Sequence, residues 1–399
     1  MATPQEPPTR PPLHTVLPPL ILGTATFNTQ YVSDPFSLPA VSIISRALSL
    51  GVSAFDTSPY YGPSESILGH ALSHESITST HPRSSYFLVT KAGRIAGDEF
   101  DYSPSWVRYS VARSLERLGT EYLDLVYMHD VEFVSPVEVL VAVKELRRLR
   151  DEEGVIRYVG ISGYPVNKLA ELASMILKET GEPLDAVLSY SHYTIQNTVL
   201  GDFVKQFQDA GVDVVLNASM LGMGLLTTRG ADAGPMTAWH PSPKALRQAC
   251  QDLVPVAVDS EEKLEVVAIR WALEHWASVG AAVGGSTAKL SPGTKVGVSV
   301  MGISNVAELE ETCDVFNNVI EGLQPESEDA EVMGRRQWSR ERRVKIQAIV
   351  EKMWTVLGKW KDYSWDSPGS GFVNTRKAED VGVTPDDGIL ATRGFKTAT

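Results

Sequence analysis

The chain has 399 residues, of which 43% are hydrophobic and 21% charged, the composition of an ordinary globular protein. Its formal net charge of −13 argues against a nucleic-acid partner, because phosphate backbones attract Lys and Arg rather than an acidic surface. Two cysteines, Cys250 and Cys313, are too few for a disulfide framework or a cysteine-rich zinc site. We therefore expect a cytoplasmic protein without a metal, and the lack of a long apolar run predicts no signal peptide and no membrane span.

In chain order, the Pro-rich residues 1–18 predict a disordered arm, because proline removes backbone donors and breaks periodicity. Short apolar runs then alternate with amphipathic segments through residues 19–325. The expected strands are Leu20–Gly23, Val52–Asp56, Tyr86–Thr90, Leu123–Met128, Ile156–Ile161, Ala186–Ser189, Val212–Leu216 and Val296–Met301. The expected helices include Val41–Leu50, Trp106–Leu118, Val137–Arg150, Lys168–Glu179, Gly201–Asp209 and Glu261–His275. Eight such units predict an α/β protein with a closed parallel (β/α)8 TIM barrel. An open doubly wound sheet is the alternative, weakened because no G-x-G-x-x-G follows the first strand.

Two segments interrupt this alternation. Thr227–Pro243 is rich in Gly and Pro and predicts a long loop after strand seven, on the face where barrel active sites lie. Thr287–Lys295 predicts a surface insertion before strand eight. Residues 326–365 predict a C-terminal helix and a loop over the barrel mouth, and residues 366–399 a disordered tail. A basic run favours a solvated helix face, with a docking patch as the alternative: Arg335, Arg336, Arg340, Arg342, Arg343 and Lys345.

Four polar residues end or follow consecutive predicted strands. Asp56 ends the second strand, and Tyr61 lies in the loop beyond it. Lys91 follows the third strand and His129 the fourth. Taken singly, each has a structural explanation, such as a turn cap, a cover for the mouth, a solvated strand end or a satisfied core histidine. Together they gather titratable groups at the rim where barrel enzymes place catalytic residues, and so predict an active site.

The sequence around these residues resembles the aldo-keto reductase family. FDTSPYYG is similar to the family signature D-T-A-x-x-Y-G, YFLVTKAG to its lysine segment and YLDLVYMHD to its histidine segment. VIRYVGISGYP resembles the G-[VI]-S-N segment, and ASMLGMGLLT the S-P-L-x-x-G-L-L segment. These matches run in order from about Leu20 to Glu321. The resemblance implies an oxidoreductase with a nicotinamide cofactor, in which Asp56, Tyr61, Lys91 and His129 are catalytic.

The chemistry of the four groups fits these implied roles. A phenol with an ordinary pKa of about 10 is a poor proton acceptor, so we expect the Lys91 ammonium to lower the pKa of Tyr61. Asp56 would pair with Lys91, and His129 would hydrogen-bond the reacting oxygen. Tyr61 would take the hydroxyl proton in oxidation and return it in reduction, while the cofactor exchanges the hydride.

Cofactor contacts also follow from the resemblance. The residues it implies lie at the ends of several strands and in the loops after them: Gly23, Thr24, Asp56, Ser162, Ser189, Ser219, Leu221, Gly224, Gly302, Ser304 and Glu308. Gly163 stands where the family usually has Asn, and Ala218 where an aromatic ring stacks on the nicotinamide. The strand-six Gln of the family falls at Ser189 or Tyr190.

The segment after strand eight bears on which nicotinamide cofactor is used. Members that prefer NADP commonly carry Arg or Lys shortly after the glycine that corresponds to Gly302, where the base pairs with the 2′-phosphate. Here no base follows, and the carboxylates Glu308 and Glu311 lie nearby. Because carboxylates repel a phosphate, we predict NAD rather than NADP. The alternative is that both residues form a solvated first turn of a helix.

Three segments, VLSYSHYT, the AWHPSP stretch after GMGLLT and the late YSWDSPG, resemble a narrower branch of the family. This branch comprises the fungal and plant sugar dehydrogenases that act on D-arabinose or L-galactose. It implies oxidation of an aldose to its lactone at the anomeric carbon. An indole face suits a sugar ring, so Trp239, His240 and Trp365 are expected to contact the substrate beside Tyr61 and His129.

Several alternatives stay open. The two tryptophans could instead anchor their loops through apolar contact. The protein could be an NADPH-dependent reductase of aldehydes and ketones, or a non-catalytic barrel that senses the cofactor. The identity of the aldose and the oligomeric state are not predicted.

Overall fold

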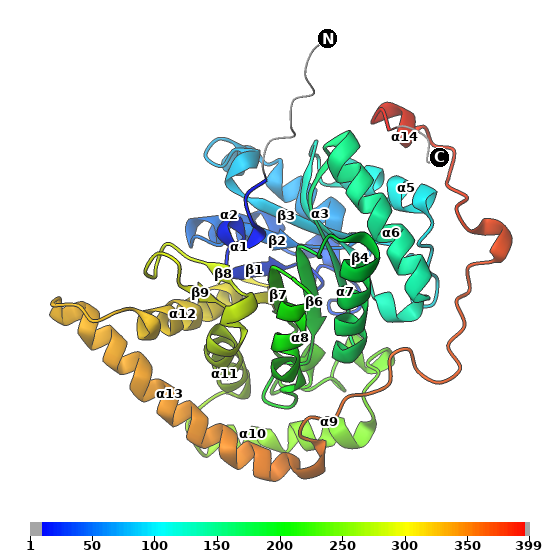
Figure 1. The fold of residues 1–399 in the computed structure, drawn as a ribbon. Helices are drawn as coiled ribbons and strands as arrows, with labels where there is room; N and C mark the ends of the chain where they lie inside the picture. The colour runs from blue at the N-terminus through cyan, green and yellow to red at the C-terminus, as the bar shows by residue number, and fades with distance from the viewer. Residues whose placement is uncertain (1–9, 396–399) are drawn as a thin grey trace.

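A computed structural model describes residues 10–395 and shows a closed barrel of parallel strands ringed by helices (Figure 1). Around the ring the strands follow the order β1-β10-β7-β6-β5-β4-β3-β2. They are β1 (Leu20–Gly23), β2 (Ala54–Asp56), β3 (Phe87–Ala92), β4 (Leu123–His129), β5 (Ile156–Gly163), β6 (Ala186–Tyr190), β7 (Val214–Ala218) and β10 (Val298–Gly302). The predicted (β/α)8 barrel is confirmed, and the open doubly wound sheet is excluded.

Several strands begin or end later in the chain than predicted. The ladders of β3 and β4 include Lys91 and His129, so these side chains lie within strands rather than after them. At the opposite end, Val52 and Val212 lie in turns, because their N–H groups bond to carbonyls of the preceding helices. An apolar residue that closes a helix-to-strand turn is as buried as a strand residue, and composition alone does not separate the two.

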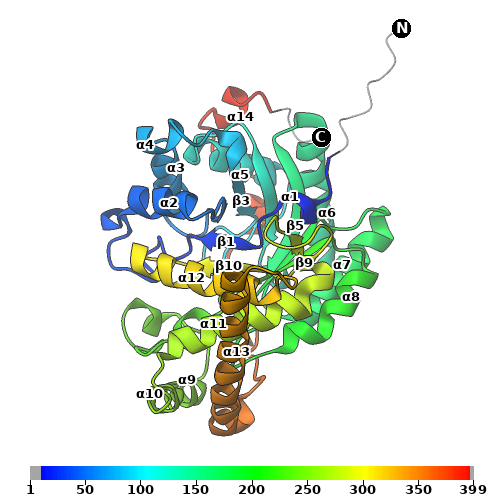
Figure 2. The same ribbon diagram turned by 90° about the vertical axis from the view of Figure 1, so that its left-hand side faces the viewer.

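The helices cover the outside of the barrel, as Figures 1 and 2 show. Ser103 caps α5, and Ser135 forms a capping box with Glu138 on α6; in both helices proline occupies the first turn. The bounds are α2 (Ala40–Ser49), α3 (Ser64–Leu72), α4 (Glu75–Thr78), α5 (Pro104–Arg117), α6 (Pro136–Arg148), α7 (Val166–Thr180), α8 (Val204–Asp209), α9 (Lys244–Gln251), α10 (Leu253–Val258), α11 (Leu264–Val279) and α12 (Val306–Leu323).

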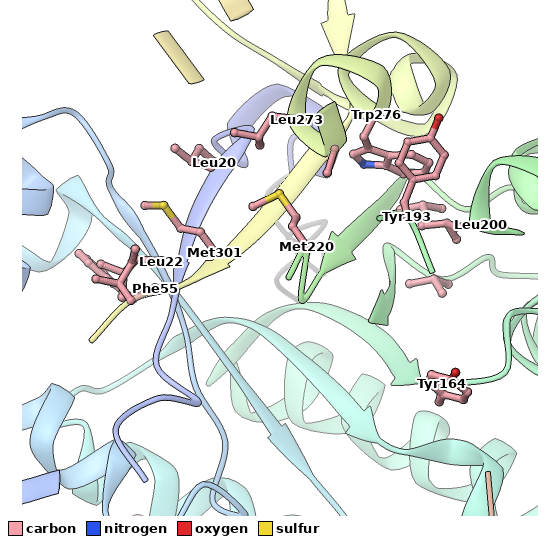
Figure 3. Close-up of a cluster of buried hydrophobic side chains, with 14 of the residues drawn as sticks. Leu20, Leu22, Phe55, Tyr164, Tyr193, Leu200, Met220, Leu273, Trp276 and Met301 are labelled. Carbon is pink, nitrogen blue, oxygen red and sulfur yellow. The ribbon is translucent and has the colours of Figure 1, made fainter. Parts of the chain in front are cut away.

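Two apolar cores stabilise this arrangement because side chains alternate between the two faces of each strand. One core lies between strands and helices; in Figure 3 it includes Leu20, Phe55 and Trp276. The other fills the barrel lumen with Ile21, Ala54, Phe87, Val89, Leu125, Tyr127, Tyr158, Leu188, Leu216 and Val298, among others. Asp56, Lys91 and His129 each stand two residues beyond a lumen residue on their strands. They therefore form a polar layer at the mouth of an apolar lumen.

The bottom of the barrel is closed by the start of the chain. The structure differs here from the predicted disordered arm: residues 10–18 are placed and contain α1 (Leu13–Val16), while residues 1–9 lie outside the described part. Leu13 and Leu17 enter the lumen core, and His14 pairs with Asp213 at 2.6 Å. The predicted insertion Thr287–Lys295 is the loop of a small hairpin, β8 (Gly285–Ser286) with β9 (Lys295–Val296), which lies against α1.

The long helix α13 (Ala330–Leu357) packs against α10, α11 and α12, along the side of the barrel (Figure 2). Most of its basic run lies on a solvated face, as predicted, since Arg335, Arg340, Arg343 and Lys345 are exposed and only Arg336 is buried. Arg342 and Lys345 also pair with Glu262, and Arg335 with Glu321. The chain then turns over the barrel mouth, where Trp365 is buried. Between residues 10 and 395 no helix is long and apolar enough to cross a membrane.

The last described segment, residues 366–395, follows the outside of the barrel and ends with α14 (Ile389–Thr392) beside α5 (Figure 1). This also differs from the predicted disordered tail. The Asn374 amide exchanges two hydrogen bonds with the backbone of Phe100, and Arg376 pairs with Glu99 and Asp101. Polar contacts of this kind leave no periodic apolar pattern, so an ordered segment could not be predicted from the sequence.

Candidate active site

A cavity of about 900 Å³ opens at the carboxyl ends of the barrel strands. Asp56, Tyr61, Lys91 and His129 all line it. Its walls also include much of the predicted loop after β7 and the C-terminal residues 365–367 and 369. Among residues 10–395 no group of three or more His, Cys, Asp or Glu side chains could hold a metal ion. The cavity therefore combines the predicted polar cluster with room for large organic ligands.

Asp56 and Lys91 form a buried ion pair at the floor of the cavity. The Lys91 ammonium donates to Asp56 Oδ1 at 2.6 Å and to the Thr57 carbonyl at 2.9 Å. The two side chains are only 6% and 2% exposed. Burial raises the pKa of Asp56, and Lys91 opposes this effect. Asp56 Oδ2 is also buried but has no hydrogen-bond partner.

Tyr61 stands over this ion pair, on the turn that follows β2. Its ring centroid lies 4.9 Å from the Lys91 ammonium and 5.7 Å from the His129 ring. The predicted lowering of the Tyr61 pKa is not what the structure supports. Burial raises that pKa well above its ordinary value, and the charges of Asp56 and Asp130 add to the rise. Before ligands bind, the phenol is therefore protonated at neutral pH.

His129 is a neutral imidazole at the end of β4. Its Nδ1 lies 3.0 Å from Ser58 Oγ, and its backbone carbonyl accepts a hydrogen bond from the Tyr102 hydroxyl at 2.6 Å. Burial lowers the pKa of His129 to about 3, although Asp130 opposes this. A neutral imidazole both donates and accepts hydrogen bonds, which suits contact with a hydroxyl or carbonyl group.

Arg94 and Asp130 form a second ion pair at the cavity, which was not predicted from the sequence. Arg94 lines the cavity, pairs with Asp130 and stacks 3.9 Å from the Tyr60 ring centroid. Burial alone would raise the pKa of Asp130, but its interactions with His129, Arg94 and Lys91 together outweigh burial and lower that pKa. The closeness of both residues to predicted catalytic residues could have indicated this pair. Arg94 lies three residues after Lys91, and Asp130 directly follows His129.

Most of the residues expected to contact the cofactor line the cavity, namely Gly23, Asp56, Ser162, Ser219, Leu221, Gly224, Gly302, Ser304 and Glu308. Thr24 and Ser189 do not, and both are fully buried behind its wall. The Thr24 hydroxyl donates to the Asp56 carbonyl at 3.1 Å, and Ser189 Oγ lies 3.4 Å from His192 Nδ1. Tyr190 rather than Ser189 reaches the cavity, next to Ala218 on the neighbouring strand.

Bases lie near the carboxylates of Glu308 and Glu311, although none was expected there. Both the Ser304 N–H and its hydroxyl donate to Glu308 at 2.8 Å. Glu311 has a base beside it, since Lys263 lies 3.7 Å away, and Lys263 and Arg229 both line the cavity. Neither base follows Gly302 closely in the sequence, so a search of that segment alone could not find them.

Aromatic side chains form the outer wall of the cavity. Trp239 and Trp365, which were expected to contact the substrate, both line the cavity, and the Trp239 indole N–H donates to the Gln30 carbonyl at 2.9 Å. His240 does not line it. Its Nδ1 accepts from the Ser242 N–H, so its Nε2 donates to the Gly222 carbonyl and neither nitrogen is free for a substrate. Further rings in the lining were not predicted: Tyr31, Tyr60 and Phe133.

Comparison with known proteins places the chain in a family. The aldo/keto reductase family model matches residues 19–324. D-arabinose 1-dehydrogenase of Saccharomyces cerevisiae is 43% identical over 268 residues, which cover 66% of this chain and 78% of that protein. L-galactose dehydrogenase of Arabidopsis thaliana is 35% identical over 239 residues, or 59% of this chain and 70% of that protein.

Solved structures agree on the fold. An aldo-keto reductase from Bacillus halodurans matches with a TM-score of 0.51 at 20% identity, covering 83% of this chain and 91% of that one. At this identity the likeness concerns the barrel alone. The family model, however, covers residues 19–324, which include all eight barrel strands that surround the cavity. The chain belongs to the aldo/keto reductase family.

Proposed function

We propose that this protein oxidises an aldose at its anomeric carbon to the lactone, with NAD as the hydride acceptor. This proposal rests mainly on one observation, the cluster of Tyr61, Lys91, Asp56 and His129 on the floor of a cavity walled by aromatic rings. Similarity to two dehydrogenases named for D-arabinose and L-galactose supports a sugar as the substrate. D-arabinose, or a sugar that presents its hydroxyls in the same way, is the first candidate.

The side chains of this cluster suit proton management at a sugar hydroxyl. The neutral His129 would hydrogen-bond the anomeric oxygen and orient it toward Tyr61. Tyr61, once ionised, would accept the hydroxyl proton, and the Asp56–Lys91 pair beneath it would keep the phenol in place. A bound nicotinamide would supply the acceptor for the hydride of the anomeric carbon. Two electrons and one proton go to the cofactor as hydride, and the second proton goes to Tyr61.

The residues present fit a nicotinamide dinucleotide. Gly224 lines the cavity with a φ of +96°, and a Cβ there would lie 2.6 Å from Met236 Sδ, so its backbone is left uncovered by a side chain. Ser219 also lines the cavity, and its hydroxyl could hold the dinucleotide. Tyr190, beside Ala218, is the ring nearest in the sheet to the expected stacking position.

The choice of NAD rests on the carboxylates at the cofactor end of the cavity. Glu308 and Glu311 would repel a 2′-phosphate but could accept hydrogen bonds from a ribose diol. One observation favours a second candidate function, an NADPH-dependent carbonyl reductase: Lys263 and Arg229 line the same cavity and could pair with a phosphate.

Steady-state rates separate these candidates. We would measure turnover of D-arabinose, L-fucose and L-galactose with NAD and with NADP, and reduction of a simple aldehyde with NADPH. Preferential oxidation of an aldose with NAD supports the proposal. A strong preference for NADPH and the aldehyde would reject it in favour of the reductase.

The proposal also includes the binding partner and the cellular compartment of this reaction. The partner is a small sugar rather than nucleic acid or a membrane, in keeping with the net charge of −13. Both cysteines are free and buried, which suits the reducing environment of the cytoplasm.

A further inference from the structure

Two polar atoms in the barrel lumen have no hydrogen-bond partner, although both are fully enclosed. One is Asp56 Oδ2, and the other is the hydroxyl of Tyr127 on β4. Tyr127 has no exposed surface and belongs to the otherwise apolar lumen core. A buried hydroxyl without a partner costs stability, so its retention in an apolar layer needs an explanation.

The sheet register brings these two groups to the same part of the lumen. Tyr127 is opposite Lys91 in the ladder between β3 and β4, and Lys91 bonds to Asp56. Asp56 also acts on the Tyr127 phenol, because its negative charge adds to burial in raising the pKa of that phenol. The phenol is therefore a protonated donor, while the free carboxylate oxygen is an acceptor.

The neighbouring strand leaves space for the ring of Tyr127. Gly160 on β5 is paired with Tyr127, and a Cβ at Gly160 would lie 2.7 Å from the ring. The same Cβ would lie 2.5 Å from the Ala186 carbonyl oxygen, so a larger residue at Gly160 would displace the Tyr127 ring, the backbone of β6, or both. The lumen thus accommodates a bulky polar side chain where a leucine would satisfy an apolar core.

We propose that Tyr127 is a positioning residue whose hydroxyl supplies the missing hydrogen bond to Asp56 Oδ2 through one bridging water molecule. A bridge is required because neither atom has a protein partner within hydrogen-bond distance. The bond stabilises the charged form of Asp56 and thereby holds the Lys91 ammonium beneath Tyr61. This inference rests on the proposed function only in that the ion pair serves the reaction at Tyr61.

The first test is the pH dependence of kcat/KM in Tyr127→Phe, which removes only the hydroxyl. Loss of a hydrogen bond to the carboxylate raises the pKa of Asp56 further. The acid limb of the profile should therefore move up by about one pH unit, equivalent to about 1.4 kcal/mol. The matched control is Tyr158→Phe, another lumen tyrosine, whose hydroxyl donates to the Pro11 carbonyl at the bottom of the barrel. Its acid limb should stay in place.

The second test does not depend on turnover. Thermal unfolding near neutral pH would be compared for Tyr127→Phe in the wild-type background and in Asp56→Asn, which keeps the shape of the side chain but not its charge. We expect a clearly larger fall in Tm in the wild-type background. Equal falls, or an acid limb that Tyr127→Phe does not move, overturn the inference. If the effects of Tyr127→Phe and Asp56→Asn on Tm are coupled but the protein does not oxidise an aldose, the proposed function is rejected and the inference about Tyr127 stands.

Discussion

Glu132 links the barrel mouth to the C-terminal segment through a buried carboxyl group. Its Oε1 accepts hydrogen bonds from the Tyr164 N–H at 3.1 Å and from the Ser367 hydroxyl at 2.9 Å. Its Oε2 is enclosed and has no partner. Burial, with Asp130 nearby, raises the pKa of Glu132 from its usual 4.5 to about 8. The group is therefore protonated in the folded protein at neutral pH and charged in the unfolded chain.

The sign of the effect on stability follows from this difference. Because the folded state binds the proton more tightly, the Glu132 contribution is fully present below about pH 4.5 and is lost as the pH rises to about 8. The shift of the Glu132 pKa from 4.5 to about 8 corresponds to roughly 5 kcal/mol of unfolding free energy if the loop that carries Glu132 stays in place. If the loop that carries Glu132 moves toward water when the carboxyl group ionises, the loss of folding stability is smaller. Glu132→Gln keeps a neutral group at the site and removes this contribution.

Urea unfolding of both proteins at several pH values from about 5 to 9 measures the difference. We expect the free energy of unfolding of the wild type to fall relative to that of Glu132→Gln across this range, so that the variant is the more stable protein at the alkaline end. Glu171→Gln, at a carboxyl group 60% exposed on α7, is the control and should leave the slope unchanged. Parallel curves for the wild type and Glu132→Gln would refute the assignment.

Three further outcomes are expected. Tyr61→Phe abolishes turnover but leaves NAD binding, measured by calorimetry, unchanged; a near-normal rate would reject proton transfer by Tyr61. Because the pKa of Tyr61 is raised, the rate of aldose oxidation should increase with pH through the neutral range, and a rate that falls would contradict this. Gly224→Ala adds a Cβ at 2.6 Å from Met236 Sδ with φ at +96°, so it should lower unfolding free energy by roughly 1–3 kcal/mol and weaken NAD binding; an unchanged melting curve would contradict it.

The barrel and the catalytic cluster could be predicted because both depend on local patterns. Apolar runs separated by amphipathic segments specify eight strands, and a polar residue two positions beyond a lumen residue faces the mouth. The same rule explains the errors at Thr24 and Ser189. Side chains alternate in a strand, so a shift of one residue moves a side chain from the cavity to the far side of the wall. Resemblance located the correct strand end but not the correct face.

Other features depend on contacts between distant parts of the chain. The pKa of Tyr61 depends on burial and on charges from distant parts of the chain, including Asp56 in β2 and Asp130 just after β4. Their combined effect cannot be predicted from the sequence. His240 was expected at the substrate, but backbone groups of its own loop occupy both of its nitrogens. The C-terminal segment is ordered by single polar contacts such as Asn374 with Phe100, which no periodicity indicates.

The charge balance at the mouth bears on the kind of substrate that the cavity accepts. Each of the two buried bases there, Lys91 and Arg94, pairs with a carboxylate on a neighbouring strand or loop. The uncharged groups near the floor are the protonated phenol of Tyr61 and the neutral imidazole of His129, whose Nε2 lies 3.5 Å from Asp130 Oδ2. A ligand carboxylate would find no unpaired cation among these four side chains, while a sugar hydroxyl would find two neutral hydrogen-bonding partners. The floor of the cavity therefore suits a neutral ligand better than a carboxylate, which agrees with the proposal of an aldose rather than a sugar acid.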